Sequence, residues 1–334
     1  MKKAILILIV LSLVSCEKTW LGIDPADDAV TNFDLVWSTV DHKYSFFTYK
    51  RINWDSIYQV YRPLVSSSTN SYELFVIIGN MLNELKDGHV NLISAFDRSR
   101  YWDWKLDYPP NFDWHLIERN YLGDDHLITG PLRNTVLDNT IGYIYYGSFG
   151  SPVSESNIDF IVGSYRNAEG IIIDIRDNGG GSLSNVETIA SRFTDEKKVV
   201  GMEYFKTGPG HDDFTGGRKI IVKPEGERQF TKPVIVLTNR ACFSASTFFV
   251  MYMKAFPHVT VIGSKTGGGG GMPISSELPN GWLYRFSSTI TTMPDGFNIE
   301  NGIEPDIQVD LDTTKIQEGV DTMIEAAIDF IKSR

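Results

Sequence analysis

VIVLTNRACFSAS (residues 234–246) and GIIIDIRDNGGGS (residues 170–182) decide the fold of this chain, because the two stretches share one layout. Each begins with an uninterrupted apolar run of strand length and ends in small residues where a helical pattern starts. Such runs are typical of parallel strands in a sheet that is covered on both faces. The two stretches therefore predict an α/β fold.

The segments around these stretches continue the alternation of strand and helix. We expect strands at residues 141–146, 170–176, 234–238 and 259–263, helices at residues 154–166, 182–193 and 244–255, and an amphipathic C-terminal helix over residues 316–331. No internal repeat is visible in this region, so we assign residues 141–334 to a single α/β core.

The N-terminal region has a helical period instead. Apolar residues recur at helical spacing in three segments of residues 33–89. Asn70 followed by Glu73 is a capping-box pattern, which marks the start of the third segment. We therefore expect a helical bundle at residues 33–89, joined to the core by an aromatic-rich connecting segment at residues 90–140.

The first residues of the chain have the pattern of a targeting signal. Two lysines precede an apolar run at residues 4–14, which is shorter than the roughly 20 residues that a spanning helix needs. The run ends in LVSC, which resembles the bacterial lipobox. We therefore expect a lipoprotein signal peptide at residues 1–15, a lipid on Cys16 and a linker at residues 16–32. The expected location is the bacterial cell envelope, with the protein tethered to a membrane and facing the periplasm or the cell surface.

Composition narrows the classes of function. The 334 residues are 22% charged and 42% hydrophobic, as is usual for a globular protein, and the net charge is -11. An acidic chain binds a phosphate backbone poorly, so we expect no nucleic-acid partner. The two cysteines are Cys16 and Cys242, and neither a CxxC nor an HExxH pattern occurs. We therefore expect no metal, no cofactor and, with Cys16 acylated, no internal disulfide.

The two strand-to-helix junctions carry residues that suit catalysis. Glycines at residues 179–181 allow a sharp turn that exposes N–H groups at a helix start, and such groups stabilise an oxyanion. Ser244 lies at the corresponding junction after the strand at residues 234–238. A tight turn without function and a simple helix N-cap explain the same patterns equally well. Spacing alone leaves both explanations open.

Several motifs together resemble one family. IIIDIRDNGGG, LTNRACFSAS and VIGSKTGGGGG follow one another in an order that resembles the serine-peptidase family of carboxy-terminal processing proteases, tricorn protease and the interphotoreceptor retinoid-binding protein. NFDLVWSTVDHKYSFF, LKDGHVNL and IENGIEPDI are similar to the same family. The resemblance implies a ClpP/crotonase-like α/β core with a helical N-terminal part. About 50 residues separate His89 from Ile141, too few for the PDZ domain that many members insert there.

The resemblance also implies a set of catalytic residues. Processing proteases use a Ser–Lys dyad, but the position of that lysine is Gly269 here, and Lys265 lies four residues too early. The tricorn-like branch uses a serine, a histidine and an acidic residue instead. By this resemblance Ser244 is the nucleophile, His89 is its base and Glu300 is the acidic partner.

Two assignments in this set have alternatives. Glu304 and Glu277 compete with Glu300 for the acidic role. The expected oxyanion donors are the N–H groups of Ala245 and Gly180, with Gly179 as the alternative in the glycine turn. Cys242 lies two residues before the expected nucleophile, where we expect a buried, inert thiol.

These inferences predict a lipid-anchored serine endopeptidase that acts on extended peptides or unfolded proteins. A non-catalytic ligand- or peptide-binding member of the same fold is the first alternative. A crotonase-type acyl-transfer enzyme is the second, although it needs no Ser–His–Glu set. A probe that labels active-site serines separates the first interpretation from both others.

Overall fold

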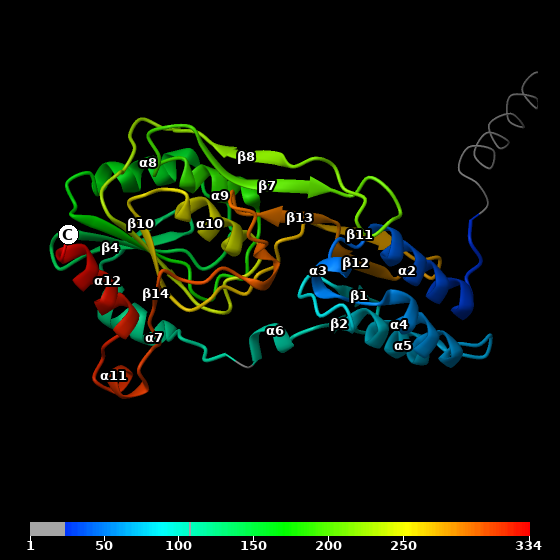
Figure 1. Cartoon of the computed structure of the whole chain (residues 1–334). Helices are drawn as coiled ribbons and strands as arrows, with labels where there is room; N and C mark the ends of the chain where they lie inside the picture. The colour runs from blue at the N-terminus through cyan, green and yellow to red at the C-terminus, as the bar shows by residue number, and fades with distance from the viewer. Residues whose placement is uncertain (1–23, 107) are drawn as a thin grey trace, which may run out of the picture.

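The computed structural model describes residues 24–106 and 108–334, so the expected signal peptide and Cys16 lie outside the described residues. None of the helices in these two ranges is both long and apolar enough to cross a membrane. The molecule is elongated, with a smaller helical part and a larger α/β part (Figure 1). An extended segment that contains α6 (Asp103–Leu106) runs between them.

A seven-stranded sheet forms the centre of the larger part, in the order β14-β10-β9-β6-β5-β4-β3. Its strands are β3 (Leu127–Thr129), β4 (Leu132–Leu137), β5 (Ile141–Tyr145), β6 (Gly170–Asp174), β9 (Val234–Thr238), β10 (Val259–Gly263) and β14 (Ile307–Gln308). The strands from β14 to β5 are parallel, whereas β4 and β3 pair antiparallel at one edge. The four predicted strands are β5, β6, β9 and β10, and each begins at the predicted residue. The expected α/β class is confirmed.

Helices cover both faces of this sheet, as the continuous apolar runs predict. The helices are α8 (Glu155–Ser164), α9 (Leu183–Ala190) and α10 (Ala245–Lys254) on one face, and the π-helix η2 (Ile117–Leu122) and α12 (Thr322–Lys332) on the other. Within β6, Ile171 and Ile173 belong to the first core and Ile172 to the second. Because neighbouring residues of a strand point to opposite faces, a strand that serves two cores has no polar face.

The helical part is not built from helices alone. Its elements are α2 (Ala29–Lys43), α3 (Phe47–Lys50), α4 (Trp54–Tyr61), the short η1 (Arg62–Leu64), α5 (Ser71–Asn83), β1 (Asn91–Ile93), β2 (Arg98–Arg100), β11 (Pro273–Glu277) and β12 (Leu283–Ser287). The capping box of Asn70 and Glu73 is present at the start of α5. The strands form a sheet in the order β11-β12-β1-β2, so a hairpin from within residues 141–334 completes the N-terminal part. The domain boundary at residue 141 stays a prediction, and this sheet crosses it.

A three-stranded sheet joins the two parts along one side of the molecule (Figure 1). It contains β7 (Lys198–Phe205), β8 (Arg218–Val222) and β13 (Thr289–Thr292), in the order β13-β7-β8. The loop between β7 and β8 reaches the helical part, where His211 stacks on Phe47 with ring centroids 4.3 Å apart and its Nε2 lies 2.8 Å from Asp41 Oδ1. The two parts are therefore held together at more than one point.

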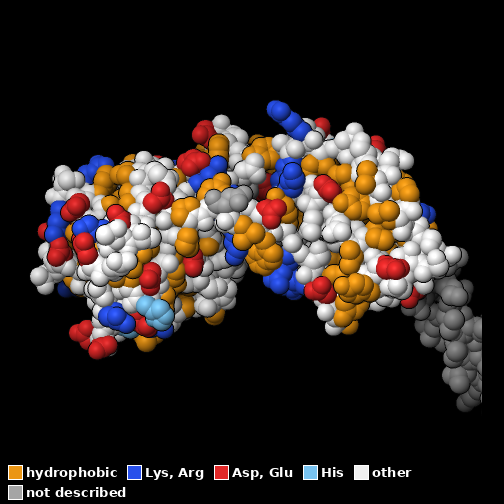
Figure 2. All heavy atoms as spheres, turned by 90° about the horizontal axis from the view of Figure 1, so that it is seen from below, with side chains coloured by type: hydrophobic (Ala, Val, Ile, Leu, Met, Phe, Trp, Pro, Cys, Tyr) orange, Lys and Arg blue, Asp and Glu red, His pale blue; other side chains and the backbone are white. Residues whose placement is uncertain are grey.

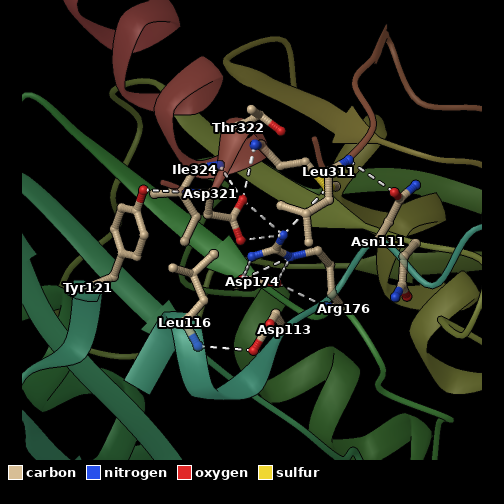
Figure 3. Close-up of polar contacts among 12 residues, drawn as sticks. Asn111, Asp113, Leu116, Tyr121, Asp174, Arg176, Leu311, Asp321, Thr322 and Ile324 are labelled. Carbon is tan, nitrogen blue, oxygen red and sulfur yellow. Dashed lines mark hydrogen bonds and ion pairs between the residues drawn. The ribbon is translucent and has the colours of Figure 1, made fainter. Parts of the chain in front are cut away.

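A buried ionic cluster fixes the C-terminal helix to the end of β6 (Figure 3). The Arg176 guanidinium lies 2.6 Å from Asp174 Oδ2 and 2.9 Å from Asp321 Oδ2, and all three side chains are fully buried. Asp321 also caps α12 by accepting bonds from the N–H groups of Met323 and Ile324. The cluster thereby supports the backbone immediately before the glycine turn at residues 179–181.

Candidate active site

Ser244 lies at the junction of β9 and α10 in a strained backbone conformation. Its φ is 57° and its ψ is -122°, a region that costs a non-glycine residue about 1–3 kcal/mol. Its N–H donates to the carbonyl of Gly268 at 2.8 Å, which holds the conformation. The side chain makes no capping bond to α10, so the N-cap explanation does not account for this serine. The hydroxyl instead lies 3.0 Å from Nε2 of His89.

His89 is brought to Ser244 by the loop that follows α5. Its backbone N–H donates to Asp87 Oδ1 at 2.7 Å, and the second oxygen of Asp87 accepts from the Ser287 hydroxyl at 2.9 Å. Burial lowers the pKa of His89 to about 4, with further lowering by the charge of Arg285, although Asp87 opposes both effects. The imidazole is therefore neutral at neutral pH and able to accept a proton from the serine.

The other ring nitrogen of His89 has a different environment. Nδ1 is buried and has no hydrogen-bond partner among the described residues. In a serine–histidine–acid triad a carboxylate accepts the proton of this nitrogen and fixes the tautomer. The structure brings Ser244 and His89 into contact but places no carboxylate on Nδ1.

Glu300 is buried near this pair but bonds elsewhere. It lies in the short helix η3 (Ile299–Asn301), and its Oε1 is 2.7 Å from Lys50 Nζ. Its Oε2 accepts a bond of 2.9 Å from the N–H of Gly270. Burial raises the pKa of Glu300 to about 7, and the charge of Asp87 adds to that effect while Lys50 opposes it. Glu300 thus supports the glycine-rich loop at residues 267–271, and its role in a triad stays a prediction.

The two alternative carboxylates, those of Glu304 and Glu277, are more exposed to solvent than that of Glu300. Glu304 is exposed and pairs with Lys265 at 3.0 Å, so the expected loop lysine is an ion-pair partner at the surface. Glu277 is exposed on β11. Of the three candidates, Glu300 alone is buried.

Lys50 is a central residue that the sequence patterns did not reveal. Its ammonium group lies 2.7 Å from Glu300 and 4.0 Å from Asp87, and it donates to the carbonyl of Lys86 at 3.1 Å. Burial alone would lower the pKa of Lys50, but the two carboxylates outweigh burial and raise it. One cation thus holds two buried carboxylates and the loop that carries His89. Asp87 could have been identified from the sequence because it belongs to the motif LKDGHVNL. Lys50 belongs to none of the quoted motifs.

The glycine turn packs directly against the serine. A Cβ added at Gly180, whose φ is +99°, would lie 2.6 Å from the carbonyl oxygen of Phe243 and 2.9 Å from the Cβ of Ser244. The N–H of Gly180 donates to Asn178 Oδ1 at 3.0 Å, so one expected oxyanion donor is already engaged. Ala245 is the first residue of α10, and its N–H belongs to the group that a helix leaves without an internal acceptor. The oxyanion role of both residues stays a prediction, as does the alternative at Gly179.

Position 269 has no room for a side chain. A Cβ added at Gly269 would lie 2.6 Å from Cζ of Phe243 and 3.0 Å from Cε1 of His89. The imidazole therefore occupies the space into which a side chain at this position would point. A lysine at position 269 of this chain would therefore contact the ring of His89.

Aromatic rings and a buried thiol complete the surroundings. The ring of Phe243 lies 4.8 Å from that of His89, and Trp104 stacks on Phe243 at 4.5 Å. Cys242 is a free, buried cysteine whose Sγ donates to the carbonyl of Ile175 at 3.0 Å. Burial raises the pKa of the Cys242 thiol to about 12, which makes it a poor nucleophile. Within the described ranges, no group of three or more His, Cys, Asp or Glu residues is placed to hold a metal ion.

Comparison with known proteins identifies the family of this chain. Peptidase family S41 matches residues 140–309, and the tricorn protease C1 domain matches residues 25–83. The crystal structure of a putative peptidase from Parabacteroides merdae is 46% identical, covers 92% of this chain and 97% of that chain, and superposes with a TM-score of 0.87. The photosystem II D1 C-terminal processing protease, at 16% identity, covers 85% and 94% of the two chains with a TM-score of 0.58 and shares the fold.

Among curated proteins, the carboxy-terminal processing protease CtpA of Bacillus subtilis is 29% identical over 177 residues. The match covers 52% of this chain and 36% of the relative, so the chain aligns with about a third of that protein's length. A serine in contact with a neutral imidazole, on a parallel sheet with a glycine turn beside it, is an arrangement suited to nucleophilic acyl transfer. The chain belongs to peptidase family S41.

Proposed function

We propose that the chain is a lipid-anchored serine endopeptidase that hydrolyses peptide bonds of extended peptides or unfolded proteins. The observation that carries this proposal is the contact of 3.0 Å between Ser244 Oγ and Nε2 of a buried His89. Burial keeps the imidazole unprotonated at neutral pH, so it is ready to act as a base.

The geometry suggests a sequence of steps. Nε2 of His89 takes the proton of the Ser244 hydroxyl as the oxygen attacks the substrate carbonyl. The N–H of Ala245 and an N–H of the glycine turn donate to the oxyanion that forms. His89 then gives its proton to the leaving amine, and water releases the acyl group by the reverse sequence.

Glu300 completes the proposed Ser–His–Glu mechanism as a supporting residue. It contacts Lys50 and Gly270, so it acts through the glycine-rich loop and the lysine that holds the His89 loop. A Glu300→Gln variant should therefore lower kcat while leaving the Ser244–His89 pair chemically intact. The conservative change keeps the volume of the side chain and removes only its charge.

Labelling with a fluorophosphonate probe tests the central assignment. We expect the wild type to be labelled and the Ser244→Ala variant to remain unlabelled, with His89→Ala labelled much more slowly. A chain that binds peptides but shows no labelling of Ser244 would support the non-catalytic binding function instead. A peptide-library digest of the purified protein would then give the cleavage preference of a labelled, active enzyme.

The proposed membrane tether depends on Cys16 and the lipobox pattern. Helix α2 begins at Ala29, 13 residues after Cys16 in the sequence, so a short segment would separate a lipid on Cys16 from this helix. Two or more acyl chains give a stable tether, since each buried CH₂ contributes about 0.8 kcal/mol. We expect fatty-acid labelling of the wild type and none of Cys16→Ser. An unlabelled wild type would contradict the tether and the cell-envelope location that follows from it.

A further inference from the structure

The indole of Trp104 lies where three loops of the candidate active site meet. It stacks on the ring of Phe243, which precedes the nucleophile, with ring centroids 4.5 Å apart and planes 27° apart. A Cβ added at Gly88, which precedes the base, would lie 2.8 Å from Trp104 Nε1, and one added at Gly267 would overlap the indole. Trp104 therefore contacts the loop of the nucleophile, the loop of the base and the glycine-rich loop.

The ring of Phe243 connects this contact to the imidazole. Its centroid lies 4.8 Å from that of His89. The same space next to Gly269 is bounded by both rings, since an added Cβ would meet Cζ of Phe243 and Cε1 of His89. Close packing of this kind restricts the orientation of side chains. Because the indole covers one face of Phe243, it limits how far that ring can turn away from His89.

Arg240 holds the backbone of the tryptophan in place. Its Nε donates to the carbonyl of Trp104 at 2.6 Å, and its Nη1 donates to the carbonyl of Thr266 at 2.6 Å. Its guanidinium also lies 4.2 Å from the ring centroid of Tyr108, which follows α6. Thr266 directly precedes the glycine-rich loop. One arginine from the loop after β9 thus connects α6 to the glycine-rich loop.

Helix α6 lies between the two parts of the molecule that supply the catalytic pair. It runs along the lower side of the molecule (Figure 1), and the view from below shows hydrophobic side chains beside Lys and Arg side chains at this junction (Figure 2). Ser244 comes from the α/β core, and His89 comes from the helical part. None of the quoted motifs includes Trp104. The segment is therefore placed to fix the two catalytic side chains relative to one another.

We propose that Trp104 is a positioning residue that holds the imidazole of His89 against Ser244. Without the indole, the ring of Phe243 has free space on one face, and the imidazole loses the packing that restricts it. A misplacement of about 1 Å at a catalytic group can lower a rate about 100-fold. This inference rests on the proposed peptidase function and adds to its site a residue that lies outside the quoted motifs.

The rate at which a fluorophosphonate labels Ser244 tests this role without a peptide substrate. We expect labelling of Trp104→Ala to be about 100-fold slower than that of the wild type. Trp104→Phe keeps a ring and loses an N–H that has no hydrogen-bond partner in the part of the chain that the structure describes, so it should retain most of the rate. Trp102→Ala is the matched control, because Trp102 is exposed beside the same helix and its ring contacts Arg100 and Lys105. This control should be labelled at the wild-type rate.

The pH dependence of labelling separates positioning from a loss of stability. Burial lowers the pKa of His89 to about 4, and water that reaches the imidazole in Trp104→Ala should raise this pKa toward the usual 6.5. The rate of the variant should therefore fall below about pH 6.5, whereas the rate of the parent should fall near pH 4. The folded fraction, measured by circular dichroism at each pH, corrects every rate for unfolding.

The other charged groups around the imidazole stay constant in this comparison. Asp87, Lys50 and Arg285 act on the pKa of His89, and none of them is changed in any variant. Glu300 has a pKa of about 7 and contacts Lys50. The pH profiles of parent and variant are therefore both measured in a Glu300→Gln background.

Failure of the positioning role and failure of the peptidase function have different signatures. Equal labelling rates and pH profiles in parent and Trp104→Ala, or an equal loss in the Trp102→Ala control, would overturn the positioning role and leave the peptidase function standing. A wild type that is never labelled at Ser244 would refute the peptidase function. In that case an NMR titration of the His89 ring still decides the contact, since an unchanged pKa in Trp104→Ala overturns the positioning role and a raised pKa supports it.

Discussion

Replacing Lys50 with methionine should destabilise the fold and should do so more strongly at high pH. The lysine side chain is 10% exposed, and those of its partners Glu300 and Asp87 are 3% and 0% exposed. Without the ammonium group, two buried carboxylates face one another with no cation between them. Breaking a buried ion pair by removing one partner costs about 3–5 kcal/mol, and we expect a loss in this range at pH 8.5.

The pH dependence follows from the protonation of Glu300. Its pKa of about 7 lies above the usual 4.5, so the folded state binds this proton more tightly than the unfolded state does. The contribution of Glu300 to stability is therefore fully present below about 4.5 and is lost as the pH rises to about 7. Without Lys50 this pKa rises further, because the nearest cation is gone, and the loss continues above pH 7. The variant should consequently lose more stability at pH 8.5 than at pH 6.

Urea unfolding of Lys50→Met at pH 6 and pH 8.5 measures both effects. Lys43→Met is the matched control, since Lys43 is exposed at the end of α2 and should change stability by less than about 0.5 kcal/mol. Adding Glu300→Gln to Lys50→Met removes the uncompensated charge, so the double variant should be more stable than Lys50→Met at pH 8.5. A loss that is the same at both pH values, or no gain in the double variant, would refute this description of the cluster.

Other features of the site lead to further expectations. In a Glu300→Gln background, which removes a second group that titrates near pH 7, the acidic limb of the kcat/KM profile should fall near pH 4, because burial lowers the pKa of His89 to about 4; a limb at 6–7 in this background would show a solvated imidazole. Ser244→Ala should abolish cleavage with little change in Tm. Gly180→Val should also abolish cleavage, but it should lower the free energy of unfolding by more than about 2 kcal/mol. Thermal unfolding of both variants measures this difference. Gly269→Lys should not restore activity to a His89→Ala enzyme, because a Cβ at position 269 still lies 2.6 Å from the ring of Phe243 after the imidazole is removed; turnover by the double variant would contradict this. Cys242 should resist a thiol reagent at pH 8 until urea unfolds the protein, and rapid labelling of the native state would show that it is accessible.

Four of the seven strands of the core sheet were predictable because they serve two apolar cores. Each of β5, β6, β9 and β10 has an apolar run bounded by polar or glycine residues, and this pattern fixes where a strand begins. The sheet β11-β12-β1-β2 was not predicted. Its strands are three to five residues long, and β1 pairs with β12 across most of the chain, so no local pattern connects them.

Only part of the candidate site was predictable, because some of its residues come from distant parts of the chain. The family resemblance indicated Ser244 and His89, and the structure brings their side chains into contact. The partners of Glu300 were not foreseen, because Lys50 lies 250 residues earlier in an unremarkable helical segment. Tertiary packing determines which residues form a buried charge cluster. The spacing of those residues in the sequence therefore does not predict the cluster.

The pairing of β1 with β12 has a consequence for the synthesis of this protein. The loop of His89 is held by Asp87, which needs the hydroxyl of Ser287, 200 residues further along the chain. A ribosome must therefore produce almost the whole polypeptide before the imidazole acquires its support. An unfinished chain that lacks Ser287 already contains Ser244 but lacks this bond to Asp87. The distance along the chain thus makes the support of His89 dependent on the last quarter of the sequence.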